Sequence, residues 1–390
     1  MPSPPGWLAS RAVVTRSLRI SVNTLSVGAG NEGIRTYLVE LVAALARMDS
    51  PHRFRLICTQ DNVEFFAGCE TSVERLVLPR RWPAVLSRLW RDQLTIPWLA
   101  RRGTDVLFTP SSVGSVLAPV RQIVAVPAHL AFASVRRGLP GPTLSWIHRI
   151  YYGPVMRLSH RRAVAVTPIS EFLSRRLVEE NGMPAAKVTM VPCGVSPAPE
   201  RRADDDSLWS PVALFVGTLY PYKNAVALLE AAALARDRLP VGFRVVIAGR
   251  DPDGRQLTRL RARARTLDLM QMVELTGPVD SERLERLYRG AGMLVFPSLA
   301  EGFGLPVLEA MARGVPVVAA DRGALPEVVG DAGLLFDPDE WSELADAMVA
   351  VSIDPILRRR LVSAGRQRAL GFSWDRSARA FVDLFERIVP

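Results

Sequence analysis

Two carboxylates flank a glycine-rich turn in the second half of the chain. Glu301 precedes the turn Gly302-Phe303-Gly304, and Glu309 follows eight residues after Glu301. Glycines let the backbone approach a ligand closely, and the free N–H groups of a following helix attract an anion. Glu301 would repel a bare phosphate, but carboxylates accept hydrogen bonds from hydroxyl groups. The pattern therefore favours a ligand that carries both phosphates and hydroxyls, such as a nucleotide-sugar.

The elements that position this turn can be predicted from short apolar runs. Residues 293–296 have the pattern of a buried strand, and a helix is predicted over 305–313. Pro306 suits the first turn of that helix, because its missing N–H is not needed there. Gly314 ends the helix, and residues 315–319 are typical of another buried strand.

A lone ammonium follows a different predicted strand. Residues 212–216 predict that strand, 217–224 a turn, and a helix begins at about Asn224. Lys223 is one of only two lysines in a chain that otherwise uses Arg, the other being Lys187. A compact ammonium can neutralise charge that grows on a leaving diphosphate. A purely surface role for Lys223 is disfavoured, because the helix dipole repels a cation at this end.

The stretch from Phe296 to Asp321 resembles the signature of retaining glycosyltransferases of the GT-B fold, family 4, whose core is E-x7-E with a G-F-G-L-P turn. Glu301 and Glu309 stand at the two Glu positions. The resemblance implies that Glu309 holds the donor ribose and that Glu301 contacts the hydroxyls of the donor sugar. It implies that Lys223 stabilises the leaving group, and that the turn binds diphosphate and sugar through its backbone, with Gly302, Phe303, Gly304 and Leu305 as donor-binding residues.

Four further donor-binding candidates come from comparison with the family pattern. The family usually has a Gly and then an Arg in the turn before the Lys, whereas this chain has Gly217 and Thr218 there. Arg250, which ends the next strand, is the candidate replacement for the missing cation. Val279 lies in T-G-P-V, which resembles the loop whose backbone meets the nucleobase.

The first half carries a glycine-rich loop at residues 28–33 after a predicted strand at 18–23. The resemblance implies that Gly30 and Gly33 face the diphosphate and the acceptor. The loop also matches G-x-G-x-x-G, so binding of a dinucleotide such as NAD is an alternative. Several residues separate the strand from the first Gly, which argues against the tight turn of that fingerprint. Asp61 also lies further along the chain than the acidic residue that the fingerprint requires. A flexible connection is the third interpretation.

His129 follows the predicted strand at 122–126. Loops at the carboxyl ends of parallel strands line the ligand crevice, so His129 joins Glu301 and Lys223 as a catalytic candidate. The resembled family often has His-Asp here, near the donor sugar, but this chain has Leu130 after the His. The alternative is a structural histidine. No cluster of His, Cys or acids accompanies His129, so no metal site is predicted.

Strand and helix patterns alternate along both halves, which predicts parallel sheets covered by helices. We therefore predict an α/β protein of the GT-B type, with two Rossmann-like doubly wound domains facing across a cleft. The further predicted strands lie at 54–58, 73–78, 106–109, 164–168, 187–191, 244–248 and 272–275. The predicted segments are a disordered leader (1–16), an acceptor-side domain (17–195), a polar linker (196–210), a nucleotide-sugar domain (211–371) and a last helix (372–390) that crosses back to the first domain.

Charge is distributed unevenly along the 390 residues, whose net charge is +10. Residues 1–200 hold 24 Lys+Arg and 13 Asp+Glu, a balance of +11, and residues 201–390 hold 25 and 26, a balance of −1. Two amphipathic stretches, 84–101 and 142–162, combine Trp or Tyr with Arg. This combination is typical of a peripheral membrane surface. The alternative is that the apolar faces pack on the sheet and the Arg side chains face water.

Composition excludes several classes. No apolar run approaches the length of a membrane span, the first sixteen residues lack the core of a signal peptide, and three scattered cysteines (Cys58, Cys69 and Cys193) form no disulfide framework. We expect a cytoplasmic protein, peripheral on the inner membrane face if its basic half meets lipid. High basicity alone suggests a nucleic-acid partner, but no reader motif accompanies it, so no nucleic acid is expected.

The residues and the family resemblance together predict a retaining, metal-independent glycosyltransferase that needs no cofactor. It would move a sugar from a nucleoside-diphosphate-sugar to a hydroxyl of a sugar or lipid-linked acceptor in cell-envelope polysaccharide or glycolipid synthesis. Other GT-B enzymes, namely a nucleotide-sugar epimerase or a phosphorylase, would share the crevice and remain alternatives. An NAD-dependent enzyme and a nucleic-acid-binding protein are the less favoured ones.

Overall fold

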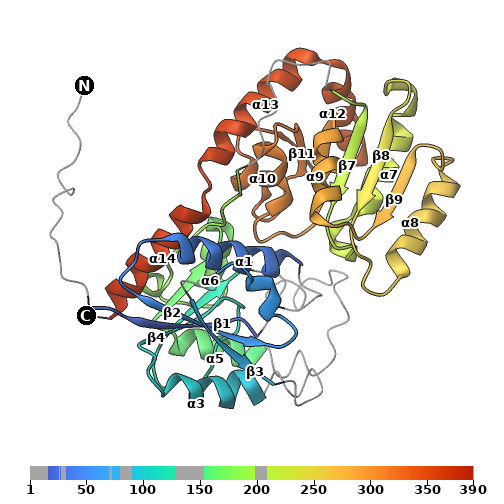
Figure 1. Cartoon of the computed structure of the whole chain (residues 1–390). Helices are drawn as coiled ribbons and strands as arrows, with labels where there is room; N and C mark the ends of the chain where they lie inside the picture. Colours follow the sequence, from blue (N-terminus) through green and yellow to red (C-terminus); the bar gives the residue numbers. More distant parts are fainter. Residues whose placement is uncertain are drawn as a thin grey trace, which may run out of the picture.

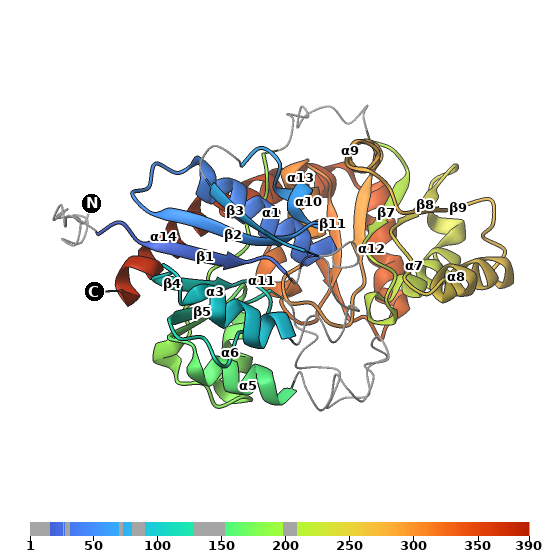
Figure 2. The same ribbon diagram turned by 60° about the horizontal axis from the view of Figure 1, so that its bottom comes forward.

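The structure is a computed structural model that describes residues 16–25, 27, 32–69, 73–79, 90–127, 153–197 and 209–389. Gly30, His129, nearly all of the expected leader and most of the expected linker lie outside these ranges. Two parallel sheets organise the described chain, one in each half (Figures 1 and 2). The predicted α/β class with two doubly wound halves is confirmed.

The first sheet has six strands in the order β3-β2-β1-β4-β5-β6, and every neighbouring pair is parallel. Its middle strands, β1 and β4, are buried on both faces because helices cover both, as parallel sheets require. The strands are β1 (Arg19–Asn23), β2 (Arg53–Thr59), β3 (Val73–Leu78), β4 (Val106–Thr109), β5 (Arg121–Val126) and β6 (Ala165–Pro168).

The second sheet repeats the plan with the order β12-β11-β10-β7-β8-β9. Its central pair, β10 and β7, is parallel, so the loops that follow these two strands emerge side by side at one edge. The strands are β7 (Val212–Val216), β8 (Arg244–Ala248), β9 (Val273–Gly277), β10 (Met293–Phe296), β11 (Val317–Ala320) and β12 (Leu334–Phe336).

Helices cover both sheets. The first half has α1 (Glu32–Arg47), α3 (Ile96–Ala100), α5 (Gly153–Arg162) and α6 (Glu171–Glu179). The second half has α7 (Ala225–Leu234), α8 (Arg255–Thr266), α9 (Ser281–Gly290), α10 (Leu305–Ala312), α11 (Leu325–Val329), α12 (Trp341–Ile353) and α13 (Pro355–Leu370), and α14 (Trp374–Ile388) ends the chain. Within the described residues, none of these helices is long and apolar enough to cross a membrane.

The last helix returns to the first sheet. Helix α14 lies beside α1 at the first sheet (Figure 1), with Phe381 and Phe385 buried against Phe108 of β4 at ring distances of 4.7 and 5.8 Å. His52 Nε2 also lies 3.1 Å from Glu386 Oε1 of α14. The C-terminal residues therefore complete the core of the first half.

One predicted strand is wrong. Residues 187–191 form no strand of the sheet, because the 3₁₀ turn Ala185–Lys187 precedes them and only the bridge between Val188 and Val166 pairs them with β6. The N–H groups of Thr189 and Val191 still bond β6 carbonyls. Pro192 ends the segment and has no N–H with which to extend a ladder.

The predicted helix over 84–101 is described only from Trp90. The chain forms a π-helical turn, Arg91–Thr95, before α3. Pro97 accounts for the irregularity, since it cannot donate the helical hydrogen bond to the carbonyl four residues before it. Trp90 and Trp98 are 61% and 50% exposed, so these indoles do not pack on the sheet, as one of the two interpretations of this stretch had them.

Truncating Phe381 should test how much the returning helix stabilises the first half. Phe381 is fully buried between Phe108 and Phe385, so Phe381→Ala leaves a cavity and should lower the free energy of unfolding by about 3–5 kcal/mol. Denaturant unfolding measures this loss. Ile356→Ala, at a side chain 72% exposed, is the control and should change it by less than about 0.5 kcal/mol. Equal effects would show that α14 contributes little to this core.

Candidate functional site

An ion pair joins two loops of the second sheet. Lys223 Nζ lies 2.5 Å from Glu301 Oε1, and the two side chains are only 13% and 11% exposed. Lys223 follows β7 and Glu301 follows β10, so the parallel pairing of these strands brings together residues 78 positions apart. The ammonium also lies 5.0 Å from the centre of the Phe296 ring, which favours a cation there.

Backbone hydrogen bonds hold both partners in place. Leu299 N–H donates to the carbonyl of Tyr222 at 2.8 Å, which ties the loop after β10 to the 3₁₀ turn Pro221–Lys223. On the other side, Ala324 N–H donates to the carbonyl of Glu301 at 3.2 Å. The acid is therefore fixed between the turn that carries Lys223 and the start of α11.

The glycine-rich turn forms the N-terminus of α10, as predicted. Gly304 caps the helix with φ +106°, a backbone conformation that favours glycine, and a Cβ there would lie 2.7 Å from Leu325 Cδ2. Leu305 begins the helix and is partly buried. The Phe303 ring is buried 5.8 Å from the Phe372 ring, so its side chain is structural and any donor contact is left to its backbone.

Glu309 projects from α10 into a polar network. Tyr288 Oη donates to Glu309 Oε2 at 2.7 Å, and Arg313 donates to the Glu309 carbonyl at 3.0 Å. Arg313 also pairs with Glu285 at 2.8 Å and lies over the Tyr288 ring. Burial raises the pKa of the Glu309 carboxyl above its usual value, while the Tyr288 hydrogen bond and the Arg313 charge offset part of the rise.

A second cluster joins the two halves of the chain. Glu32, at the start of α1, accepts a 3.4 Å hydrogen bond from Thr218 Oγ1, and its other oxygen lies 3.9 Å from Arg250 Nε. Thr218 and Arg250 are neighbours because Leu219 N–H donates to the Arg250 carbonyl at 2.8 Å. Thr218 occupies the position where a cation was expected, and Arg250 is the candidate replacement. Both therefore contact the same carboxylate, that of Glu32 in the first half.

A glycine permits the close approach behind this cluster. A Cβ on Gly249 would lie 1.8 Å from the carbonyl oxygen of Gly217, so the turn after β7 can contact the loop after β8 only because residue 249 is glycine. A Cβ on Gly217 would make only ordinary contacts with the Phe215 ring, so space alone does not require glycine there.

A third contact spans the halves at α11. The carboxylate of Glu327 accepts hydrogen bonds from the N–H groups of Glu171 and Phe172, at 2.9 and 2.8 Å, at the N-terminus of α6. An acid at a helix N-terminus is favoured by the helix dipole. Burial nevertheless raises the pKa of Glu327 above its usual value. Glu32 and Glu327 both follow the carboxyl end of a strand, so these edges of the two sheets face each other.

The remaining predicted site residues are not joined to the ion pair by any described contact. Gly33 lies exposed in the first turn of α1 rather than in a loop, because the helix already begins at Glu32, whose negative charge suits a helix N-terminus. Val279 is partly buried after β9 and packs against the main core. Gly30 and His129 lie outside the described residues.

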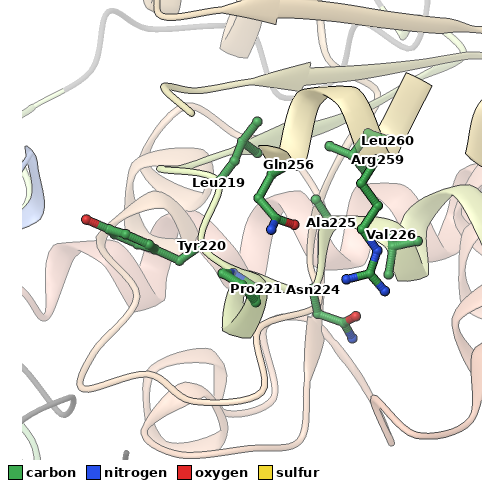
Figure 3. A pocket seen from close by; sticks show the side chains of 9 residues that line it. All are labelled: Leu219, Tyr220, Pro221, Asn224, Ala225, Val226, Gln256, Arg259 and Leu260. Atoms are coloured by element: carbon green, nitrogen blue, oxygen red, sulfur yellow. The ribbon is translucent and has the colours of Figure 1, made fainter. Parts of the chain in front are cut away.

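A small pocket lies behind the turn that carries Lys223 (Figure 3). The turn, the start of α7 and the helix α8 surround it, and Figure 3 shows Arg259 and Asn224 on the same side of it. Its lining residues are Leu219, Tyr220, Pro221, Asn224, Ala225, Val226, Gln256, Arg259 and Leu260. Neither Lys223 nor Glu301 lines it, so it is separate from the ion pair. Among the described residues, no group of three or more His, Cys, Asp or Glu could hold a metal ion.

Solved glycosyltransferase structures share this architecture. The Anabaena protein HepE, in complex with UDP and glucose, is 18% identical with a TM-score of 0.73, covering 95% of this chain and 100% of that chain. Sucrose-phosphate synthase from Thermosynechococcus elongatus is 20% identical with a TM-score of 0.71, covering 96% and 99%. The two sheets and their opposed edges therefore define a GT-B fold.

Family models match both halves. Residues 32–194 match the glycosyl transferase 4-like domain, and residues 201–368 match glycosyl transferases group 1. The chain therefore belongs to the GT-B glycosyltransferases of group 1, as the E-x7-E stretch predicted.

Curated relatives are similar over part of their length. The D-inositol 3-phosphate glycosyltransferase of Corynebacterium jeikeium is 36% identical over 181 residues, 45% of this chain and 43% of that protein. The O-antigen chain mannosyltransferase B of Escherichia coli is 30% identical over 223 residues, 55% and 58%. The match spans about half the length of these relatives.

Sequence reasoning missed Glu32, Tyr288 and Glu327. Glu32 carried a weak signal, since it stands in the glycine-rich loop just before a predicted helix. Tyr288 and Glu327 carried none, because their partners lie 21 and 156 positions away in other elements.

The Lys223–Glu301 pair should show strong coupling in a double-mutant cycle. Lys223→Met or Glu301→Gln alone leaves a largely buried charge unpaired and should lower the free energy of unfolding by about 3 kcal/mol. The double variant should lose less than the sum, with a coupling energy of about 1–3 kcal/mol. Denaturant unfolding of all four proteins measures it.

The exposed pair Arg238–Asp346, at 2.7 Å with side chains 49% and 68% exposed, provides the matched control. The cycle with Arg238→Met and Asp346→Asn should give a coupling below about 1 kcal/mol. Equal coupling in the two cycles would contradict the importance of burial for the Lys223–Glu301 pair.

Proposed function

We propose that this protein transfers a sugar from a nucleoside-diphosphate-sugar to a hydroxyl group, with retention of the anomeric configuration. The observation that carries the proposal is the Lys223–Glu301 pair beside the glycine-capped N-terminus of α10. This arrangement places a cation, an acceptor of hydroxyl hydrogen bonds and a helix N-terminus within one loop cluster. A nucleotide-sugar has a chemical group for each of them.

In the proposed reaction, the bond between the sugar's anomeric carbon and the diphosphate oxygen breaks, and a bond from the acceptor oxygen to that carbon forms on the same face. The electron pair of the broken bond stays on the diphosphate, where Lys223 stabilises the charge. The departing phosphate takes the proton of the acceptor hydroxyl. Glu301 holds the hydroxyls of the donor sugar, and Glu309 holds the ribose.

Arg250 is the proposed second cation. It lies beside Thr218, which fills the slot expected for an Arg, and its present partner is the carboxylate of Glu32. Two cations and a helix N-terminus supply the positive charge that Mg²⁺ supplies in other phosphoryl sites, so we propose a metal-independent reaction without a cofactor. His129, Gly30, Gly33 and Val279 remain proposed contacts of the donor or acceptor.

The proposed acceptor is a sugar or a lipid-linked sugar in the cytoplasm, used in the synthesis of cell-envelope polysaccharide or glycolipid. Two observations support this class. The relatives are named for glycosylation of an inositol phosphate and of an O-antigen chain, and the basic first half suits an anionic acceptor. The three cysteines are free and buried, which suits a reducing compartment.

A panel of nucleotide-sugars tests the donor. A donor that binds the folded protein at one hundred times its Kd should add about 2.7 kcal/mol to the free energy of unfolding, and thermal unfolding measures the increase. Lys223→Gln should lower kcat about 10²–10³-fold with that donor, because Lys223 acts on charge that develops during the reaction.

Lys187→Gln is the matched control, since it changes the only other lysine, whose ammonium bonds the carbonyls of Arg161 and Ala163 in the first half. Its turnover should equal that of the unchanged protein. Full turnover in Lys223→Gln, or no stabilisation by any donor, would refute the proposal. Epimerised free sugar formed without an acceptor would instead favour a nucleotide-sugar epimerase.

Tyr288→Phe should change the pH dependence. The Tyr288 hydrogen bond lowers the pKa of Glu309, so its loss raises that pKa further above its usual value. The carboxylate that holds the ribose then protonates at higher pH, so the acidic limb of kcat/KM for the donor should shift to higher pH. Activity at the alkaline end of the profile should recover.

Tyr220→Phe is the control for this measurement, because Tyr220 stacks on Tyr222 in the same half but does not contact Glu309. Its pH profile of kcat/KM should have the same acidic limb as that of the unchanged protein. A loss in Tyr288→Phe that is uniform across pH would show that the hydroxyl supports packing rather than the ionisation of Glu309.

A further inference from the structure

The helical segment from Trp90 to Arg102 exposes large apolar side chains in a line. Trp90, Leu94 and Trp98 are 61%, 41% and 50% exposed, and they recur every four residues. The opposite side of the segment is buried, with Ile96 packed against Ile57 of β2 and Leu107 of β4. The stripe is therefore not the face that holds the segment on the sheet.

Positive charge accompanies the stripe. Arg101 and Arg102 are exposed at its end, and the Arg102 guanidinium lies 4.1 Å above the Trp98 ring. The one acid among residues 90–102, Asp92, is buried and accepts a 3.4 Å hydrogen bond from Asn23 Nδ2. The exposed side therefore combines indole rings and guanidinium groups with no carboxylate.

We propose that this face, formed by Trp90, Leu94, Trp98, Arg101 and Arg102, binds the surface of an anionic lipid bilayer. Tryptophan is favoured at the boundary between acyl chains and headgroups, and arginine pairs with anionic headgroups. A helix with an apolar stripe and basic residues lies in the plane of that boundary. The charge balance of this part of the sequence agrees, because residues 75–176 hold 16 Arg against three acids.

The position of the face leaves the ion-pair site free. Helix α3 packs on the side of the first sheet opposite to the one that α1 and α14 cover, and Figure 1 shows it at the bottom of that half, distant from the second sheet. A bilayer held there contacts the first half alone. The first half would then sit next to hydroxyl groups at the membrane surface while the second half binds the donor.

Vesicle flotation with the full chain tests the proposal, without donor or acceptor, so that its result does not depend on sugar transfer. Vesicles of phosphatidylcholine with phosphatidylglycerol are compared with phosphatidylcholine alone, at low and high salt. The unchanged protein should float with the anionic vesicles and be released by salt. The triple variant Trp90→Ser, Leu94→Gln, Trp98→Ser should bind them at least about tenfold more weakly.

The matched control changes three exposed apolar residues of the second half, Trp341→Ser, Ile353→Gln and Ile356→Gln, which are 41%, 62% and 72% exposed. It should float like the unchanged protein. Arg101→Ser with Arg102→Ser should weaken binding to the anionic vesicles alone. Circular dichroism and the unfolding midpoint show whether each variant is folded. If the triple variant is unfolded, the indole fluorescence of the unchanged protein tests the proposal instead. This fluorescence should shift to shorter wavelength when anionic vesicles are added.

Absence of flotation by the unchanged protein, or equal flotation of the triple and control variants, overturns the proposal. So does equal binding to neutral vesicles. Sedimentation velocity adds one more outcome: if the triple variant abolishes a concentration-dependent dimer while flotation stays unchanged, the face is a contact between copies of the chain, and the proposal is wrong.

Discussion

The site depends on one largely buried ion pair, Lys223 with Glu301. Two charges taken out of water are costly, and their attraction repays that cost only if each meets the other at close range. The sheet meets this condition because β7 and β10 are parallel neighbours and end at the same edge. The glycine-capped helix α10 begins just beyond Glu301, so the same edge also presents a helix N-terminus. The strand order therefore sets the chemistry of the site.

Acids from both halves form contacts between the facing edges of the two sheets. Glu32 extends from the first half toward Thr218 and Arg250, and Glu327 extends from the second half to the N-terminus of α6. Both contacts place a carboxylate opposite positive partial or full charge. A phosphate-bearing ligand needs the same kind of partner, so the cation that Glu32 now faces is also the one available to a diphosphate.

Local patterns predicted the parts of the site that lie within a single strand–turn–helix unit. The turn at Gly304, the helix with Glu309 and the strands on either side follow from glycine, proline and apolar spacing, and the structure has them close to the predicted bounds. Contacts between units could not be predicted in this way. The Lys223–Glu301 and Tyr288–Glu309 pairs depend on which strands are neighbours, and a local pattern does not contain the strand order. The strand predicted at 187–191 failed for a related reason, because an apolar run shows extended backbone but not whether a ladder forms.

The segment from Trp90 to Arg102 shows that helical periodicity also does not predict which side chains pack on the sheet. Its amphipathic pattern was compatible with an apolar face on the sheet, yet the residues that pack are Ile96, Pro97 and Ala100, and the larger indoles face outward. Pro97 removes a helical hydrogen bond, and the π-helical turn before it adds residues to the helical path, so the positions of the faces shift. A stripe of indoles on the outside is costly in water unless something covers it. The guanidinium groups beside the stripe are cationic, and its one acid is buried. An anionic surface is therefore the partner that matches its charge.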